Sequence, residues 1–126
     1  MKTVEDLNRL IRDEIAAIEA LRSEDEKIWS IRGGVTEADA KRSKKIRRMI
    51  GDHNNEIAHL RRLIRFVEAT PEEGVRMMLD QLRGQVERIT TSADRYKLKE
   101  QKKEYLNRAS VQLKHTQIAE LEFLLQ

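Results

Sequence analysis

Apolar residues recur at spacings of three and four along most of the chain, which is the period of an amphipathic α-helix. In the first third, one stripe contains Val4, Leu7, Ile11, Ile15 and Ile18. A second stripe, about 100° further around the helix, contains Leu10, Leu21 and Ile28. The pattern predicts a helix over about residues 4–32 that contacts two neighbours rather than one.

A second helix is predicted over about residues 37–68. Its apolar stripe contains Ile46, Ile50, His53, Ile57, Leu60, Ile64 and Val67. Between the two helices, Gly33 and Gly34 end the first, and Thr36 offers a hydroxyl that caps the second. Because the connection is short and both helices are long, we expect an antiparallel helical hairpin about 45 Å long.

The third segment starts at Thr70-Pro71, where the threonine hydroxyl is expected to cap and proline to occupy the first helical position. One apolar stripe then runs in phase through Val75, Leu79, Leu82, Val86, Ile89, Ala93 and Tyr96. The favoured prediction is one long or kinked helix over 71–125. The alternative is a break near 90–93, where Thr91 and Asp94 form a possible cap, which would give a four-helix bundle.

The third segment also predicts self-association. A helix of about 55 residues spans about 80 Å, so a hairpin of about 45 Å leaves part of it uncovered. Its last turn, Phe123-Leu124-Leu125, is too apolar to stand alone in water. We therefore expect an all-α, coiled-coil or bundle-like fold of a single domain over 1–126 that forms a homo-oligomer.

Composition narrows the classes of function. The chain has no cysteine, which excludes disulfides, thiolate metal sites and cysteine nucleophiles. No apolar run approaches the length of a membrane span, and the first residues lack the apolar core of a signal peptide. The expected location is the cytoplasm, without membrane contact.

Positive charge concentrates in the middle of the chain. Residues 35–68 hold nine basic and five acidic residues, a net charge of +4, whereas residues 1–34 hold six and eight, a net charge of −2. A basic segment of this kind favours an anionic partner.

Two basic clusters are the candidate ligand-binding residues. The first lies in the run 41–48 and comprises Lys41, Lys44, Lys45 and Arg48; the second comprises Arg61, Arg62 and Arg65. Such residues neutralise phosphates, and arginine binds phosphate or carboxylate with two parallel hydrogen bonds. The competing interpretation of the first cluster is a solvated helix face. That of the second is salt bridges between subunits to the acids of the first helix, namely Glu14, Glu19, Glu24, Asp25 and Glu26.

A third basic group surrounds Tyr96, where aromatic stacking on a base is conceivable. It contains Arg95, Lys97, Lys99, Lys102 and Lys103. Glu100 and Glu104 on neighbouring turns favour pairing within the helix instead.

Arg48 and His53 are separated by four residues, a spacing that resembles the ribonuclease motif of HEPN-type helical domains. On a helix these two side chains point about 140° apart. Glu56 and His59 match one Glu-x-x-His half-site of a ferritin-like di-iron bundle, but the chain holds no second copy. His53 lies in the apolar stripe. Two interpretations are open: a core histidine that is hydrogen-bonded to a neighbour, or an interface residue that responds to pH.

The sequence holds no glycine-rich phosphate loop, nucleophile elbow or His-Glu-x-x-His motif. The prediction is a non-enzymatic homo-oligomer, without a cofactor, that binds or sequesters a phosphorylated small molecule or a nucleic acid. The first alternative is an adaptor or scaffold that binds a protein partner and no anion. The second is a ribonuclease of HEPN type.

Overall fold

The computed structural model describes residues 1–30 and 33–126, which contain five helices and no strand. The predicted all-α class is therefore confirmed. The chain divides into two compact units, one formed by Thr3–Ala69 and the other by Met1–Lys2 with Thr70–Gln126. Among the helices so described, none is long and apolar enough to cross a membrane.

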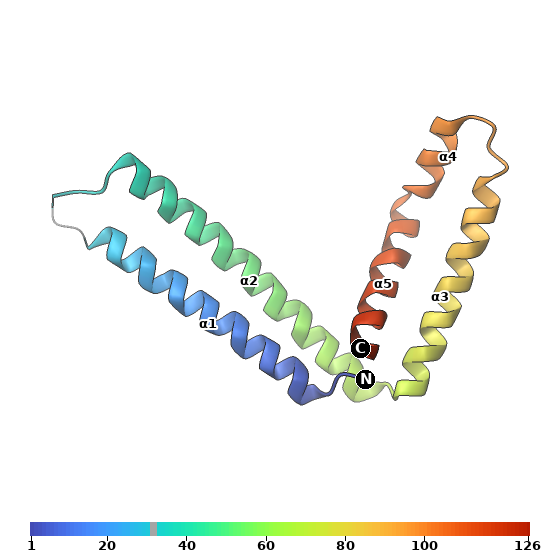
Figure 1. Cartoon of the computed structure of the whole chain (residues 1–126), viewed down its shortest axis with the longest axis horizontal. Coiled ribbons are helices and arrows are strands. Elements are labelled where there is room, and N and C mark those ends of the chain that lie inside the picture. The colour runs from blue at the N-terminus through green and yellow to red at the C-terminus, as the bar shows by residue number, and fades with distance from the viewer. Residues whose placement is uncertain (31–32) are drawn as a thin grey trace. The chain divides into compact units, whose positions relative to one another are not determined.

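The first unit is a helical hairpin of α1 (Val4–Trp29) and α2 (Glu37–Ala69), which lie side by side (Figure 1). The two helices run in opposite directions. Glu14 contacts His53, whereas Glu24, later in α1, contacts Arg42, earlier in α2. The antiparallel hairpin predicted from the sequence is confirmed. Residues 31 and 32, expected at the end of the first helix, lie outside the described residues.

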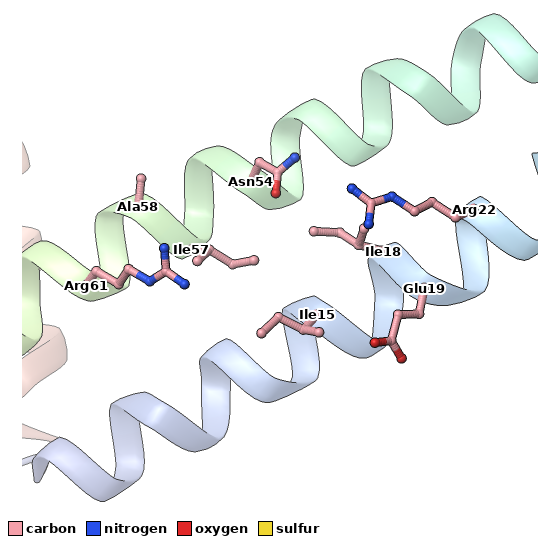
Figure 2. A pocket seen from close by; sticks show the side chains of 8 residues that line it. All are labelled: Ile15, Ile18, Glu19, Arg22, Asn54, Ile57, Ala58 and Arg61. Carbon is pink, nitrogen blue, oxygen red and sulfur yellow. The ribbon is translucent and has the colours of Figure 1, made fainter.

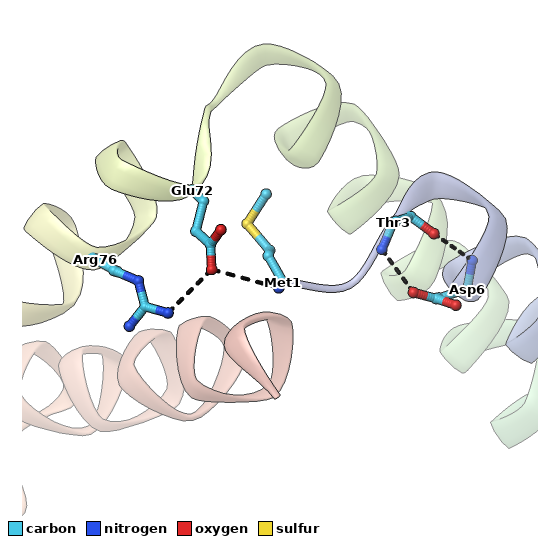
Figure 3. Close-up of polar contacts among 5 residues, drawn as sticks. All are labelled: Met1, Thr3, Asp6, Glu72 and Arg76. Atoms are coloured by element: carbon cyan, nitrogen blue, oxygen red, sulfur yellow. Dashed lines mark hydrogen bonds and ion pairs between the residues drawn. The ribbon is translucent and has the colours of Figure 1, made fainter.

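Both helices of the hairpin begin at a threonine cap. The backbone N–H of Asp6 donates to Thr3 Oγ1 over 3.1 Å, and the Thr3 N–H donates back to Asp6 Oδ2 over 2.9 Å (Figure 3). Before α2, the Asp39 N–H donates to Thr36 Oγ1 over 3.1 Å. Gly33 and Gly34 have φ of +102° and +98°, a left-handed conformation that glycine adopts without a steric cost.

The core of the hairpin is built mainly from the predicted stripes of both helices, although Leu63 joins it and Ile15 is 39% exposed. It contains Leu7, Ile11, Ile18, Leu21 and Ile28 of α1 and Ile46, Ile57, Leu60 and Leu63 of α2. Leu21 and Ile28 pack against Ile46, so both apolar stripes of α1 serve the one hairpin. Burial of each such side chain stabilises the fold by about 1.5–3 kcal/mol.

The third segment is not a single helix over 71–125, and the favoured prediction is wrong there. It forms α3 (Glu72–Ala93), α4 (Lys99–Leu106) and α5 (Ala109–Leu125). The chain reverses just after α3, and α5 returns along α3, where Arg83 pairs with Glu122 over 3.0 Å. The break lies just after the alternative site near 90–93 and makes a second hairpin. The cap expected from Thr91 is wrong, since its hydroxyl donates to the Glu87 carbonyl and α4 begins at Lys99, which gives five helices instead of four in the described residues.

Local hydrogen bonds and burial explain this reversal. The hydroxyls of Thr90 and Thr91 donate to the carbonyls four residues earlier, and the amides of residues 94–96 bond only three residues back. A straight helix would leave the apolar residues of 109–125 in water. The reversal buries Val111, Leu121 and Leu124 in the same unit as Val75 and Leu79.

This reversal removes the main sequence argument for self-association. The uncovered helix of about 80 Å does not exist, because the chain's own second hairpin takes up the apolar residues. The homo-oligomer and the single domain over 1–126 stay predictions. The cap expected from Thr70 is also wrong, since Pro71 is the N-cap residue of α3 and no side chain bonds there.

The first two residues belong to the second unit. The Met1 amine lies 3.5 Å from Glu72 Oε1, which also accepts from Arg76 Nη2 over 3.1 Å (Figure 3). The Lys2 N–H donates to the Leu124 carbonyl over 2.6 Å. The bond from Arg76, with the nearby amine, lowers the pKa of the Glu72 carboxyl below its usual value.

Candidate anion-binding face

The solvent side of α2 carries a long surface without acids. Ten residues between positions 44 and 65 lie within an arc of about 140° of the helix, and all ten are exposed. We call this surface the acid-free face of α2; it consists of Lys44, Arg47, Arg48, Gly51, Asn54, Asn55, Ala58, Arg61, Arg62 and Arg65. Six of the ten are basic, and the other four are small or carry an amide.

The cations of this face are largely uncompensated. Within the described part of the chain, Lys44, Arg48, Arg61 and Arg65 form no ion pair. The two acids of α2 between positions 44 and 65, Asp52 and Glu56, lie on the flank outside the arc. These four cations therefore present their positive charge to solvent rather than to the protein's own carboxylates.

Two of the six cations do have neighbours. Arg47 Nε lies 3.8 Å from Asp25 Oδ2, and its guanidinium lies 5.9 Å from the centre of the Trp29 ring. Arg62 Nη2 lies 2.7 Å from His59 Nδ1. Both arginines remain exposed, so these contacts fix the side chains without covering them.

The structure places five of the seven predicted binding residues on the acid-free face: Lys44, Arg48, Arg61, Arg62 and Arg65. Lys41 and Lys45 are also exposed, but they lie on the neighbouring flank with Asp52 and Glu56. Lys41 forms an ion pair of 3.6 Å with Glu37 one turn earlier.

The acids of α1 pair with α2, but not through the predicted clusters. Glu24 accepts two bonds from Arg42, from Nε over 2.7 Å and from Nη2 over 3.0 Å. The bond from Arg42 lowers the pKa of the Glu24 carboxyl. Asp25 accepts from the buried Ser43 hydroxyl. These contacts lie within one chain, and they leave Arg61 and Arg65 without a carboxylate partner among the described residues.

A groove of about 260 Å³ lies between α1 and α2 beside the acid-free face. Its apolar floor is formed by Ile15, Ile18 and Ile57. Arg22 reaches from α1 towards Asn54, and Arg61 extends from α2 at the other end (Figure 2). Glu19 and Ala58 complete the lining, so two guanidinium groups and one carboxylate border the groove.

Sequence reasoning missed Arg47, Asn54 and Arg22. Arg47 lies eighteen positions before Arg65, which is five full helical turns, so a helical projection of the run 41–48 could have aligned the two. Arg22 carries no such signal, because its place beside Asn54 follows from the register of the hairpin.

Within the described residues, the structure completes neither of the two histidine motifs. Arg48 lies on the acid-free face, whereas His53 is half-buried against Glu14 of α1. The interpretation of His53 as a histidine bonded to a neighbour fits this contact. The residues that the structure describes contain no group of three or more histidine or acidic side chains that could hold a metal ion, so the Glu56–His59 half-site stands alone.

Comparison with known proteins gave no match to a family model, a curated protein or a solved structure.

Proposed function

We propose that the protein is a non-enzymatic nucleic-acid-binding protein that holds the phosphate backbone through the acid-free face of α2. The observation that carries this proposal is that six basic residues of α2 share one side of the helix and are all exposed there. Six cations, two asparagines, one glycine and one alanine share one side of the helix, and none of the ten is buried.

The shape of the face favours an extended anion over a compact one. From Lys44 to Arg65 the helix advances about 32 Å, and its basic residues gather at the two ends. Duplex DNA carries one charge per about 1.7 Å of its axis, so it can meet both ends at once. A single phosphorylated small molecule reaches only one.

The middle of the face suits close approach to a nucleic acid. Gly51 and Ala58 have short or absent side chains, and the carboxamides of Asn54 and Asn55 can both donate and accept hydrogen bonds. Asparagine also bonds adenine through two atoms in the DNA major groove. The proposal also includes the cytoplasmic location that the sequence predicts, where a nucleic-acid ligand can be met.

The test is fluorescence anisotropy with a labelled 20-base-pair duplex across a salt series. Wild-type affinity is expected to fall steeply with salt, because phosphate contacts release counterions. Arg61→Ala with Arg65→Ala is expected to reduce the slope of log K against log salt by about 2.

The matched control is Arg9→Ala with Lys27→Ala, which removes the same charge from exposed positions of α1. This control should keep the wild-type slope. Equal losses in both double variants would show that only net charge matters, and the proposed face would then be wrong.

A second candidate is a scaffold that assembles from copies of this chain, favoured by the flank of α3 that faces away from its charged residues. We call this the charge-poor flank of α3; it contains Met77, Met78, Gln81, Gly84 and Gln85, with Arg88 as its one charge. Met77 is 63% exposed and Met78 is 40% exposed. We propose a second copy of the chain as the occupant, which would make the protein a homo-oligomer.

A further inference from the structure

The turn from α3 to α4 brings two tyrosines and an arginine together in the second unit. The rings of Tyr96 and Tyr105 lie 5.2 Å apart between centroids and are tilted by 42°. The Arg108 guanidinium lies 4.9 Å from the centre of the Tyr105 ring. Tyr96 remains 38% exposed, so a ring supported by its neighbour is still accessible from solvent.

Local bonds hold Tyr96 in place. The amides of Asp94, Arg95 and Tyr96 donate to the carbonyls of residues 91–93 over 3.1–3.2 Å. Lys102 Nζ bonds Asp94 Oδ1 over 2.7 Å and ties α4 to the end of α3. A ligand that meets this ring therefore orders little additional chain, which reduces the entropic cost of binding.

Positive charge surrounds the ring pair. Residues 94–108 contain six basic and three acidic residues, so these fifteen positions hold a net charge of +3, the same as the whole chain. In the described structure Lys97, Lys99 and Lys103 are exposed and form no ion pair. The pairing with Glu100 and Glu104 that the sequence favours is therefore not formed.

We propose that this tip of the second unit binds an unpaired base of a single-stranded nucleic acid, stacked on Tyr96, while the neighbouring lysines contact the flanking phosphates. Aromatic rings bind bases of any sequence because every base has a π-face, and a basic surface follows the backbone. Bases within a duplex are already stacked on one another, so the site selects unpaired strands.

An anionic membrane surface is the other polyanion that an exposed Tyr-Lys-Leu segment could meet, since Leu98 is 61% exposed. The geometry favours the base. Tyr96 is held against a second ring instead of projecting as an insertion anchor, and Leu98 is the one large aliphatic side chain of 94–108 that is exposed in the described structure. The inference does not rest on duplex binding by α2, because the two surfaces belong to different units.

The experiment measures anisotropy of a labelled 15-nucleotide oligo-dT and of a duplex, with the full chain in each case. Tyr96→Ala is expected to weaken oligo-dT binding by about tenfold, as for the loss of one base–aromatic stack. Tyr96→Phe keeps the ring and should bind like wild type. Neither variant should change duplex binding, and circular dichroism confirms that both fold.

A second readout locates the base directly. Oligo-dT with 5-bromouracil at single positions is irradiated with the protein, and the crosslinked peptide is identified by mass spectrometry. A crosslink to Tyr96 supports the proposal. Unchanged oligo-dT affinity of Tyr96→Ala, or crosslinks only at other residues, overturns it.

Two further outcomes separate this inference from its neighbours. If Tyr96→Ala loses binding to phosphatidylserine vesicles while wild type shows no oligo-dT binding, the site is a membrane contact and the inference is wrong. If duplex binding fails but oligo-dT binding depends on Tyr96, the function proposed for α2 fails and this inference stands.

Discussion

Ser43 shows how single polar side chains join the two helices of the first hairpin. Its hydroxyl is buried, accepts from Trp29 Nε1 over 2.9 Å and donates to Asp25. A buried hydroxyl without partners would destabilise the fold by about 1–3 kcal/mol, so this site is stable only because both bonds form. Trp29 is 53% exposed, so its link to α2 is this hydrogen bond rather than a buried packing contact.

The ion pair of Glu24 with Arg42 predicts a dependence of stability on pH. The bond from Arg42 lowers the pKa of Glu24 in the folded state, so the pair stabilises the protein above the unfolded pKa of about 4.5. That stability is lost as pH falls through the lower, folded pKa. Thermal melts at pH 7 should therefore show Glu24→Gln to be less stable than wild type, and the difference should narrow as the pH is lowered below 4.5.

The control for this prediction is Glu26→Gln, which removes an exposed acid of α1 that has no ion pair among the described residues. Its difference from wild type should change less between pH 7 and pH 3. A difference for Glu24→Gln that does not narrow between pH 7 and pH 3 would contradict the assignment of the effect to this carboxylate.

At the scale of elements, the second hairpin depends on the apolar residues that α5 buries. Leu124 is fully buried, and Leu124→Ala is expected to lower the free energy of unfolding by about 2–5 kcal/mol through lost burial and a cavity. Leu113→Ala, on the same helix but exposed, should change it by less than about 0.5 kcal/mol. Urea unfolding measures both, and equal effects would mean that α5 does not pack as described.

Glycines at two positions should respond in opposite directions. Gly84 lies inside α3, and a Cβ there would meet only Arg88 Nη2, at 3.9 Å. Gly84→Ala is therefore expected to stabilise the protein by about 0.5–1 kcal/mol in urea unfolding, because alanine favours the helix. Gly34→Ala places a side chain at φ +98° and should destabilise by about 1–2 kcal/mol. If Gly34→Ala stabilised the protein, the positive φ described for this turn would be wrong.

The first hairpin could be predicted from the sequence because every signal for it is local. The threonine cap with Asp6, the two glycines and the apolar stripes each act within a few residues. The break after Ala93 has a weaker local signal, the pair Thr91 and Asp94, because no glycine or proline lies there and the stripe from Val75 to Tyr96 stays in phase. It is decided by burial of Leu121 and Leu124, residues far away in the sequence.

For the candidate site too, local features could be predicted from the sequence and contacts between the helices could not. Clusters of lysine and arginine are visible in the sequence, and a helical projection shows which of them share a side. The partners of the acids in α1 were not visible. Glu24 binds Arg42 because of the register of the hairpin, which leaves the cations at 61 and 65 unpaired among the described residues.

At the scale of the whole molecule, the open question is what covers the remaining apolar surface. The folded-back α5 buries Leu124 and partly buries Phe123 and Leu125, the residues that first predicted self-association, so we look for an oligomer interface on another surface. The charge-poor flank of α3 is suitable, because Met77 and Met78 are exposed and their flexible side chains adapt to an irregular partner.

We therefore expect light scattering after size exclusion at about 50 µM to give a mass above the 14.8 kDa of one chain. Met77→Lys with Met78→Lys should return the mass to 14.8 kDa, because an interface at this flank would bury the two added charges without partners. Leu113→Lys changes an exposed residue of α5 and should leave the mass unchanged. A wild-type mass of 14.8 kDa at this concentration would reject the homo-oligomer, and the acid-free face would then have to bind nucleic acid as a single copy. The slope of the salt series measures that case directly, since six cations on one face can release counterions equivalent to a slope of about 5 at most.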